Sequence, residues 1–213
     1  MITDRFVEEY ICTLNEDLPE YLFEIEKKAL EDGVPIIKRP TQNLLRFLIR
    51  NSKVCSILEV GAAVGFSSLL MHEYMENEGK IITIEKMHSR AVEAVDNIER
   101  AGKNNYIKVI EGDALEELSK IEESFDMVFI DAAKGQYNNY FDDIIGKLSG
   151  RGILVCDNVL QEGEIARSRY AVTRRNRTIH GRMREFLYMI THDDRLDTIV
   201  LPIGDGVTIS YIK

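Results

Sequence analysis

Tryptophan is absent from this chain of 213 residues, and cysteine and proline are scarce, with three and four copies. The cysteines, Cys12, Cys55 and Cys156, are odd in number and form no C-x-x-C pair, which disfavours a disulfide framework or a zinc ribbon and favours a reducing compartment. No run approaches the roughly 18–20 apolar residues of a membrane span. The acidic start, with Asp4 and Glu8, is unlike a signal peptide. We therefore expect a cytoplasmic protein with no membrane segment.

The composition is that of a globular protein, with 45% hydrophobic and 30% charged residues. A chain of this length forms one ordinary domain and buries its core without cross-links. We expect a single domain over residues 1–213, in which residues 1–52 form a helical extension and residues 53–213 form an α/β core.

Hydrophobic periodicity predicts helices in the first 52 residues and then an alternation of short apolar strands with amphipathic helices. The early helices are expected at 3–14, 19–32 and 41–51, with an extended connector at 34–40. Strands are expected at 55–60, 80–85, 106–111, 126–131 and 152–156, and the helices between them at 66–77, 88–101, 114–120 and 137–148. A helix near 178–192 and a hairpin at 198–203 and 207–212 complete the chain. This alternation predicts a doubly wound, mostly parallel sheet that ends in an antiparallel hairpin.

Three predicted strand ends carry residues suited to an adenosyl ligand. A glycine turn, with Gly61 and Gly65, follows the first strand and lets a ligand approach the backbone. Glu85, at the end of the second strand, can accept both hydroxyls of a ribose. Asp113, in the G-D-A that follows the third, can reach an adenine amino group. Each of these three signals is weak alone. They support one another because parallel sheets bind ligands at the edge formed by the carboxyl ends of their strands.

A second group of polar residues follows the fourth and fifth predicted strands. Asp131 comes after one, and Asp157 and Asn158 come after the other. Because these strand ends are neighbours in a doubly wound sheet, the three side chains offer hard oxygen ligands for Mg²⁺, Mn²⁺ or Ca²⁺. The alternative is that both acids are solvated loop residues or helix caps.

Together these motifs resemble the cation-dependent O-methyltransferase family, which includes catechol and caffeoyl-CoA methyltransferases. The resemblance spans nearly the whole chain and implies S-adenosylmethionine as methyl donor and Mg²⁺ as metal. It implies these cofactor-binding residues: Lys38, Glu59, Gly61, Ser67, Ser68, Glu85, Asp113, Ala114 and Asp131. It implies Asp131, Asp157 and Asn158 as metal ligands. Asp131 and Lys134 would be catalytic, with Lys134 taking the acceptor's proton or steadying its oxyanion.

Charge is segregated along the chain. The net charge is −9, yet residues 167–184 hold seven arginines and no acid, which is +7 against −16 for the rest. Such a segment suggests a polyanionic partner bound at one place. A solvated helical face is the alternative.

Within the family, the chain is most similar to the bacterial methyltransferases that convert 5-hydroxyuridine at the tRNA wobble position to 5-methoxyuridine. The shared segments are 34–36, 131–137, 157–160 and 202–206. We therefore expect the tRNA anticodon region as partner, bound by Arg174, Arg175 and Arg177, and a homodimer, since relatives often pair. The rival hypotheses are a methyltransferase for a small catechol-like molecule and a non-catalytic RNA- or nucleoside-binding domain. A nicotinamide-dependent dehydrogenase is disfavoured because G-x-G-x-x-G is absent.

Overall fold

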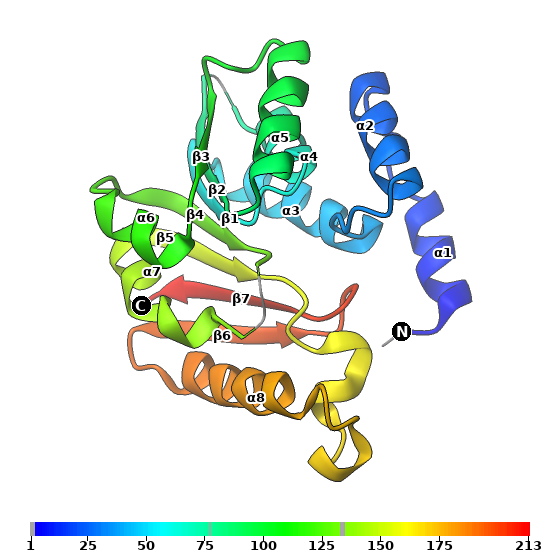
Figure 1. Ribbon diagram of the computed structural model, residues 1–213, viewed down its shortest axis with the longest axis vertical. Helices are drawn as coiled ribbons and strands as arrows, with labels where there is room; N and C mark the ends of the chain where they lie inside the picture. Colours follow the sequence, from blue (N-terminus) through cyan, green and yellow to red (C-terminus); the bar gives the residue numbers. More distant parts are fainter. Residues whose placement is uncertain (1–2, 77, 133–134) are drawn as a thin grey trace.

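A seven-stranded sheet runs through the computed structural model, which describes residues 3–76, 78–132 and 135–213 (Figure 1). The strand order is β3-β2-β1-β4-β5-β7-β6. The strands are β1 (Ser56–Val60), β2 (Lys80–Glu85), β3 (Ile107–Glu111), β4 (Phe125–Ile130), β5 (Leu148–Cys156), β6 (Leu196–Leu201) and β7 (Val207–Ile212). The predicted α/β class with its C-terminal antiparallel pair is confirmed.

Strands β1 to β5 are parallel, and β7 is inserted antiparallel between β5 and β6. The chain builds outward from β1 to β3 and then returns to the other side of β1 to place β4. The strand order thus reverses between β1 and β4. The carboxyl ends of strands at such a switch point border the crevice in which open α/β sheets bind ligands.

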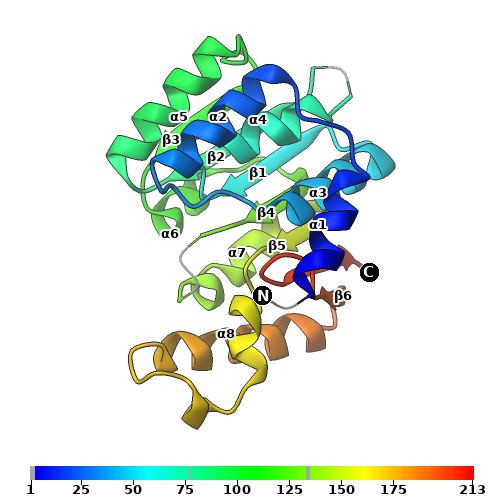
Figure 2. The same ribbon diagram turned by 90° about the vertical axis from the view of Figure 1, so that its right-hand side faces the viewer.

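Helices cover both faces of the sheet (Figures 1 and 2). The α-helices are α1 (Arg5–Thr13), α2 (Glu20–Glu31), α3 (Arg39–Ser52), α4 (Phe66–Glu73), α5 (His88–Arg100), α6 (Ala114–Glu117), α7 (Phe141–Lys147) and α8 (Arg177–His192). Short 3₁₀ helices are η1 (Leu118–Lys120), η2 (Tyr137–Asn139), η3 (Gln161–Ala166) and η4 (Arg169–Ala171). In the three described ranges, no helix has the length and apolar character needed to cross a bilayer.

The core consists of two apolar clusters, one on each face of the sheet. Alternate residues of a strand point to opposite faces, so Ile57 of β1 joins the cluster under α2, α3 and α4, and Leu58 joins the cluster under α7 and α8. Met127 and Val128 of β4 divide in the same way. Burial on both faces explains why the central strands read as continuous apolar runs.

Three predicted helices differ from the observed ones. The helix expected at 114–120 is α6 followed by the 3₁₀ turn η1. The helix expected at 137–148 is a 3₁₀ turn followed by α7, because the backbone at Tyr140 (φ −116°, ψ 14°) is not helical. The helix expected at 66–77 ends at Glu73. The long connection after β5 contains the short turns η3 and η4 and leads into α8.

Candidate active site

A cavity of about 820 Å³ lies at the carboxyl edge of the parallel strands. The extended connector before α3 and the loops after β1 to β5 form its walls. It brings together eight of the predicted site residues: Lys38, Gly61, Glu85, Asp113, Ala114, Asp131, Asp157 and Asn158. A smaller cavity of about 330 Å³ between α2 and α5 contains none of them.

The turn after β1 depends on glycine. Gly61 has φ +105°, and its amide donates to the carbonyl of Ile84 at 2.9 Å. A Cβ at this position would collide with the backbone carbonyl of Asp131. Only glycine therefore allows the ends of β1 and β4 to approach each other here, which keeps this wall of the cavity free of side-chain atoms.

Glu85 is held in a fixed position at the end of β2. Its side chain is only 8% exposed, and its two carboxylate oxygens accept hydrogen bonds from the amides of Ala63 (2.9 Å) and Met87 (2.8 Å). Each oxygen still has a lone pair for a second donor. The geometry therefore suits an oriented acceptor for two ligand hydroxyls.

Asp113 caps α6 at the next strand end. Its carboxylate accepts from the amide of Leu115 at 3.0 Å and pairs with the ammonium of Lys86 at 2.7 Å. The hydrogen bond from Lys86, followed by that from Leu115, lowers the pKa of Asp113. This acid is thus an ionised acceptor at the end of the cavity that also holds Ala114.

Three predicted cofactor residues, Glu59, Ser67 and Ser68, are buried and are not part of the cavity lining. The hydroxyls of Ser68 and Thr83 donate to one carboxylate oxygen of Glu59, the latter at 2.6 Å. Burial raises the pKa of Glu59. These residues join β1, β2 and α4 behind the glycine turn, so they support the cavity wall from within the protein.

Asp131, Asp157 and Asn158 meet as predicted. In the register of β4 and β5, Ile130 pairs with Cys156, so the residues that follow each strand lie side by side. The amide nitrogen of the Asn158 side chain donates to Asp131 at 2.6 Å, and the backbone amide of Asn158 donates to Asp157 at 2.7 Å. Asn158 adopts φ +62°, a conformation that asparagine tolerates.

Asp157 is buried, with an exposed fraction of 3%, and the charged groups that shift its pKa are the acids Asp131 and Asp205. Burial, helped by the charge of Asp131, raises the pKa of Asp157 to about 7. A bound cation would relieve this repulsion, and two carboxylates with an amide are the hard donors that Mg²⁺ prefers. Within residues 3–76, 78–132 and 135–213, no group of three or more His, Cys, Asp or Glu side chains is arranged to hold a metal ion, so the candidate set is limited to these two carboxylates and one amide.

Lys38 reaches across the rim of the cavity. Its ammonium lies 2.7 Å from the carboxylate of Asp205, in the β6–β7 turn, and 3.8 Å from that of Glu162. The connector is thereby joined to the C-terminal hairpin. Sequence reasoning missed Asp205, although its place between two glycines was a sign of an ordered turn. The predicted catalytic residue Lys134 lies outside the described residues.

Two buried tyrosines beside the cavity were also missed. The Tyr137 hydroxyl lies 3.1 Å from the carbonyl of Asp157 and 3.4 Å from that of Ile130. It therefore ties the loop after β4 to the loop after β5. Tyr140 lines the cavity, and its hydroxyl has no hydrogen-bond partner among the described residues. No local pattern distinguishes these two roles in the sequence.

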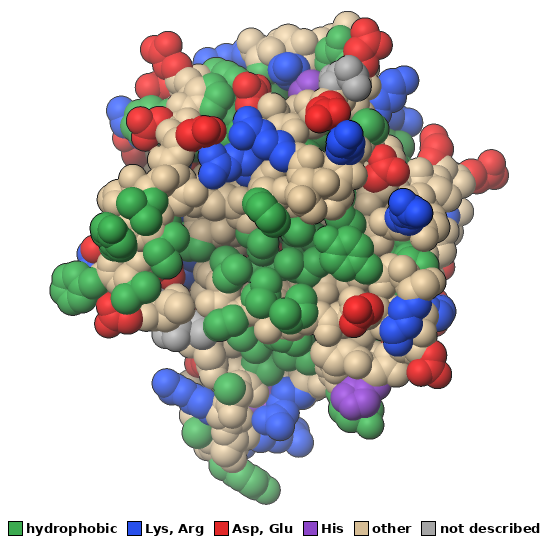
Figure 3. Space-filling model, turned by 180° about the vertical axis from the view of Figure 1, so that it is seen from behind, with side chains coloured by type: hydrophobic (Ala, Val, Ile, Leu, Met, Phe, Trp, Pro, Cys, Tyr) green, Lys and Arg blue, Asp and Glu red, His purple; other side chains and the backbone are tan. Residues whose placement is uncertain are grey.

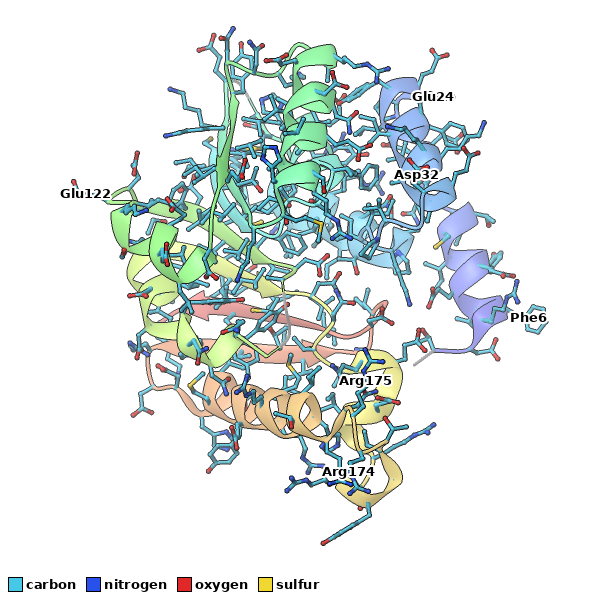
Figure 4. All side chains as sticks on the ribbon, viewed as in Figure 1. Phe6, Glu24, Asp32, Glu122, Arg174 and Arg175 are labelled. Carbon is cyan, nitrogen blue, oxygen red and sulfur yellow. The ribbon has the colours of Figure 1, made fainter. Side chains whose placement is uncertain are left out.

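The arginine segment, residues 167–184, forms a protruding lobe that contains η4 and the first half of α8, and Arg174 and Arg175 lie in the loop between them (Figure 4). Three arginines bind backbone carbonyls: Arg177 that of Val172, Arg182 that of Gly135, and Arg184 those of Ile165 and Arg167. Arg174 and Arg175 are exposed, and their side chains make no hydrogen bond or ion pair with any described residue. Seen from behind, basic side chains gather at one end of the molecule (Figure 3).

Comparisons with known proteins agree with this geometry. An O-methyltransferase family model matches residues 13–212. A catechol O-methyltransferase of Niastella koreensis is 32% identical over 75% of each chain. A Staphylococcus aureus structure is 28% identical with a TM-score of 0.91, covering 98% of this chain and 100% of that one. A Bacillus cereus O-methyltransferase, solved with S-adenosylhomocysteine, is 25% identical with a TM-score of 0.86, covering 98% and 97%.

The fold that carries the strand-end acids and the glycine turn is therefore that of a methyl-transferring enzyme. The chain belongs to the O-methyltransferase family.

Proposed function

We propose that this protein is an S-adenosylmethionine- and Mg²⁺-dependent O-methyltransferase that converts 5-hydroxyuridine at the tRNA wobble position to 5-methoxyuridine. One observation carries the proposal. Gly135, in the loop that follows Asp131, contacts the arginine segment 167–184, which itself contains no acid, because the Arg182 guanidinium donates to the Gly135 carbonyl at 3.0 Å. A polyanionic acceptor bound to the lobe would thus lie next to the candidate site.

The donor fits the residues on the cavity wall. Glu85 would accept the ribose hydroxyls, Asp113 would accept the adenine amino group, and the bare turn at Gly61 would leave room for the methionine end. S-adenosylmethionine supplies an electrophilic methyl group. Because methyl transfer is an in-line displacement, the cavity accelerates it chiefly by aligning the acceptor oxygen with that methyl carbon.

A divalent cation fits the neighbouring set of Asp131, Asp157 and Asn158. When bound there, Mg²⁺ supplies Lewis acidity that lowers the pKa of an acceptor hydroxyl. The hydroxyl of Tyr137 anchors the backbone of Asp157, and the backbone amide of Asn158 orients the Asp157 side chain. These contacts place the two loops that carry the set before any ligand binds.

The acceptor class is inferred from the lobe. Arg174 and Arg175 are free to bind phosphates, whereas Arg177 is tied to the backbone of its own segment. Tyr170, between Arg169 and the exposed pair, is 88% exposed, as suits a surface on which an unpaired base stacks. Arginine binds both phosphates and base faces, so this combination fits a single-stranded loop of RNA.

A small catechol-like acceptor is the second candidate. A relative named as a catechol O-methyltransferase supports it, and a small acceptor needs only the cavity and the cation. The two candidates differ in what they require of the lobe, since a neutral small molecule has no phosphate for Arg174 and Arg175 to bind.

The experiment compares the double variant R174A/R175A with a matched control, K27A/K108A, which also removes two exposed cations that have no partner among the described residues. If tRNA is the acceptor, the KM for hydroxyuridine-containing tRNA should rise in R174A/R175A and stay unchanged in K27A/K108A. The slope of log affinity against log salt should flatten by about 1.4, at about 0.7 per single-strand phosphate contact. Equal tRNA kinetics in both variants, with efficient methylation of a catechol, would favour the second candidate.

A further inference from the structure

The loop after β4 packs against α8. The Arg182 guanidinium donates to the carbonyl of Gly135 at 3.0 Å, and the Asn138 side chain donates to the carbonyl of Arg182 at 3.4 Å. One turn further along α8, the ring of Phe186 meets that of Tyr137 edge-on, with centroids 5.2 Å apart. Residues four apart on a helix share a face, so Arg182 and Phe186 present one surface to this loop.

Tyr137 connects this contact to the candidate cation site. Its side chain is 1% exposed, and its hydroxyl lies 3.1 Å from the carbonyl of Asp157. The same hydroxyl lies 3.4 Å from the carbonyl of Ile130, the residue before Asp131. If Tyr137 moved away from α8, the backbone next to both acids would lose this connection.

Arg182 supplies the part of this contact that lies outside the apolar core. Phe186 is buried in the cluster under α7 and α8, so its contribution cannot be separated from the stability of the whole domain. Arg182 is exposed, and its guanidinium lies directly over the backbone of Gly135, where an added Cβ would be 3.2 Å from Nη1. The bond from Arg182 thus holds the loop without being part of the core.

We propose that Arg182 is a positioning residue, which holds the loop after β4 against α8 and thereby keeps Asp131 and Asp157 in the arrangement that binds the cation. This inference rests on the cation site of the proposed function and is independent of the acceptor. A site that is correctly arranged in only a fraction of molecules binds its ligand more weakly by that fraction. Loss of the Arg182 bond lowers this fraction, so it weakens cation binding although a guanidinium is itself no metal ligand.

The test measures Mn²⁺ binding to the full chain by electron paramagnetic resonance, in which the signal of free Mn²⁺ falls as the ion binds. Arg182→Met removes the guanidinium and keeps an apolar stem. The Kd for Mn²⁺ should rise about 5- to 10-fold, the effect of one lost hydrogen bond. Loss of a positive charge by itself favours binding of a cation, so this weakening cannot come from charge. Arg182→Lys, which keeps a cationic donor, should lie closer to wild type.

The affinity for S-adenosylhomocysteine should be unchanged in both variants, because Glu85 and Asp113 follow β2 and β3, at the end of the sheet far from α8. A general loss of structure would weaken this affinity as well. Binding of this ligand therefore separates positioning of the cation site from damage to the fold.

Arg184→Met is the matched control. Arg184 lies on the same helix and is also exposed, but it bonds the carbonyls of Ile165 and Arg167. Its substitution should leave Mn²⁺ binding unchanged. If Arg182→Met binds Mn²⁺ as wild type does, or if Arg184→Met weakens binding as much, the inference is wrong, because the effect is then absent or common to any arginine of α8. If wild type itself binds no Mn²⁺, the proposed cation site is wrong, and the inference fails with it.

Discussion

Neutralising Asp157 should make the cation-free protein more stable at neutral pH. The pKa of Asp157 is raised from an ordinary value of 3.8 to about 7, first by burial and then by Asp131. The folded state therefore holds this proton more tightly than the unfolded state does. The resulting stability is fully present below about pH 4 and is lost as the pH rises to about 7. At 1.36 kcal/mol per pKa unit, the loss amounts to about 4 kcal/mol.

Urea unfolding of wild type and Asp157→Asn in EDTA, at intervals from pH 4 to pH 8, measures this directly. The asparagine keeps the oxygen that accepts from the backbone amide of Asn158. The unfolding free energy of wild type, relative to the variant, should fall by about 4 kcal/mol across the range. Added Mg²⁺ should reverse the fall at pH 8 in wild type alone. Parallel curves for the two proteins, or a wild-type unfolding free energy that rises relative to that of the variant as the pH increases, would refute the electrostatic reasoning about this site.

The other predictions concern the cation, the ribose acceptor and the glycine turn. In an assay of methyl transfer from S-adenosylmethionine, EDTA should abolish activity and Mg²⁺ or Mn²⁺ should restore it. Full activity in the presence of chelator would show that the reaction needs no metal. Glu85→Gln should weaken S-adenosylhomocysteine binding at least 10-fold by calorimetry, because it removes charge-assisted acceptors worth about 1.5–3 kcal/mol each. An unchanged Kd would mean that Glu85 serves only to hold the two backbone amides that it accepts from. Gly61→Ala should lower stability by about 1–3 kcal/mol from backbone strain alone and abolish cofactor binding, whereas Gly102→Ala, which meets nothing within 4 Å, should lower stability and leave binding intact.

Strand ends were the part of the site that the sequence predicted well. Parallel strands place their carboxyl ends at one edge, so Glu85, Asp113 and the Asp131–Asp157 pair were expected together, and all line one cavity. Their register follows from apolar strands buried on both faces, which leaves little freedom for slippage.

Side-chain direction was predicted less well. Glu59 lies two residues after Ile57, so both point to the α4 face of the sheet, and Glu59 bonds Ser68 and Thr83 there instead of facing the cavity. The alternation of side chains along β1 predicts that Glu59 points to the same face of the sheet as Ile57. The family motif at residues 59–65 only indicated that Glu59 lies near the ligand, without specifying that face.

The hydrogen bonds of the arginine segment could not be predicted. The sequence singled out Arg174, Arg175 and Arg177, yet Arg177 bonds the carbonyl of Val172. Arg182 bonds Gly135, in the loop after β4, whereas Arg174 makes no bond to a described residue. The separate fates of the Tyr137 and Tyr140 hydroxyls depend in the same way on which backbone carbonyls the fold brings near. The pairing of two copies stays a prediction, which light scattering of the purified protein tests.

The most direct test of the account is nucleoside mass spectrometry of tRNA that contains 5-hydroxyuridine, after incubation with the purified protein, S-adenosylmethionine and Mg²⁺. We expect 5-hydroxyuridine to disappear as an equal amount of 5-methoxyuridine forms, and neither change to occur with Asp157→Asn. Unmodified 5-hydroxyuridine, under conditions in which the same protein methylates a catechol, would contradict it.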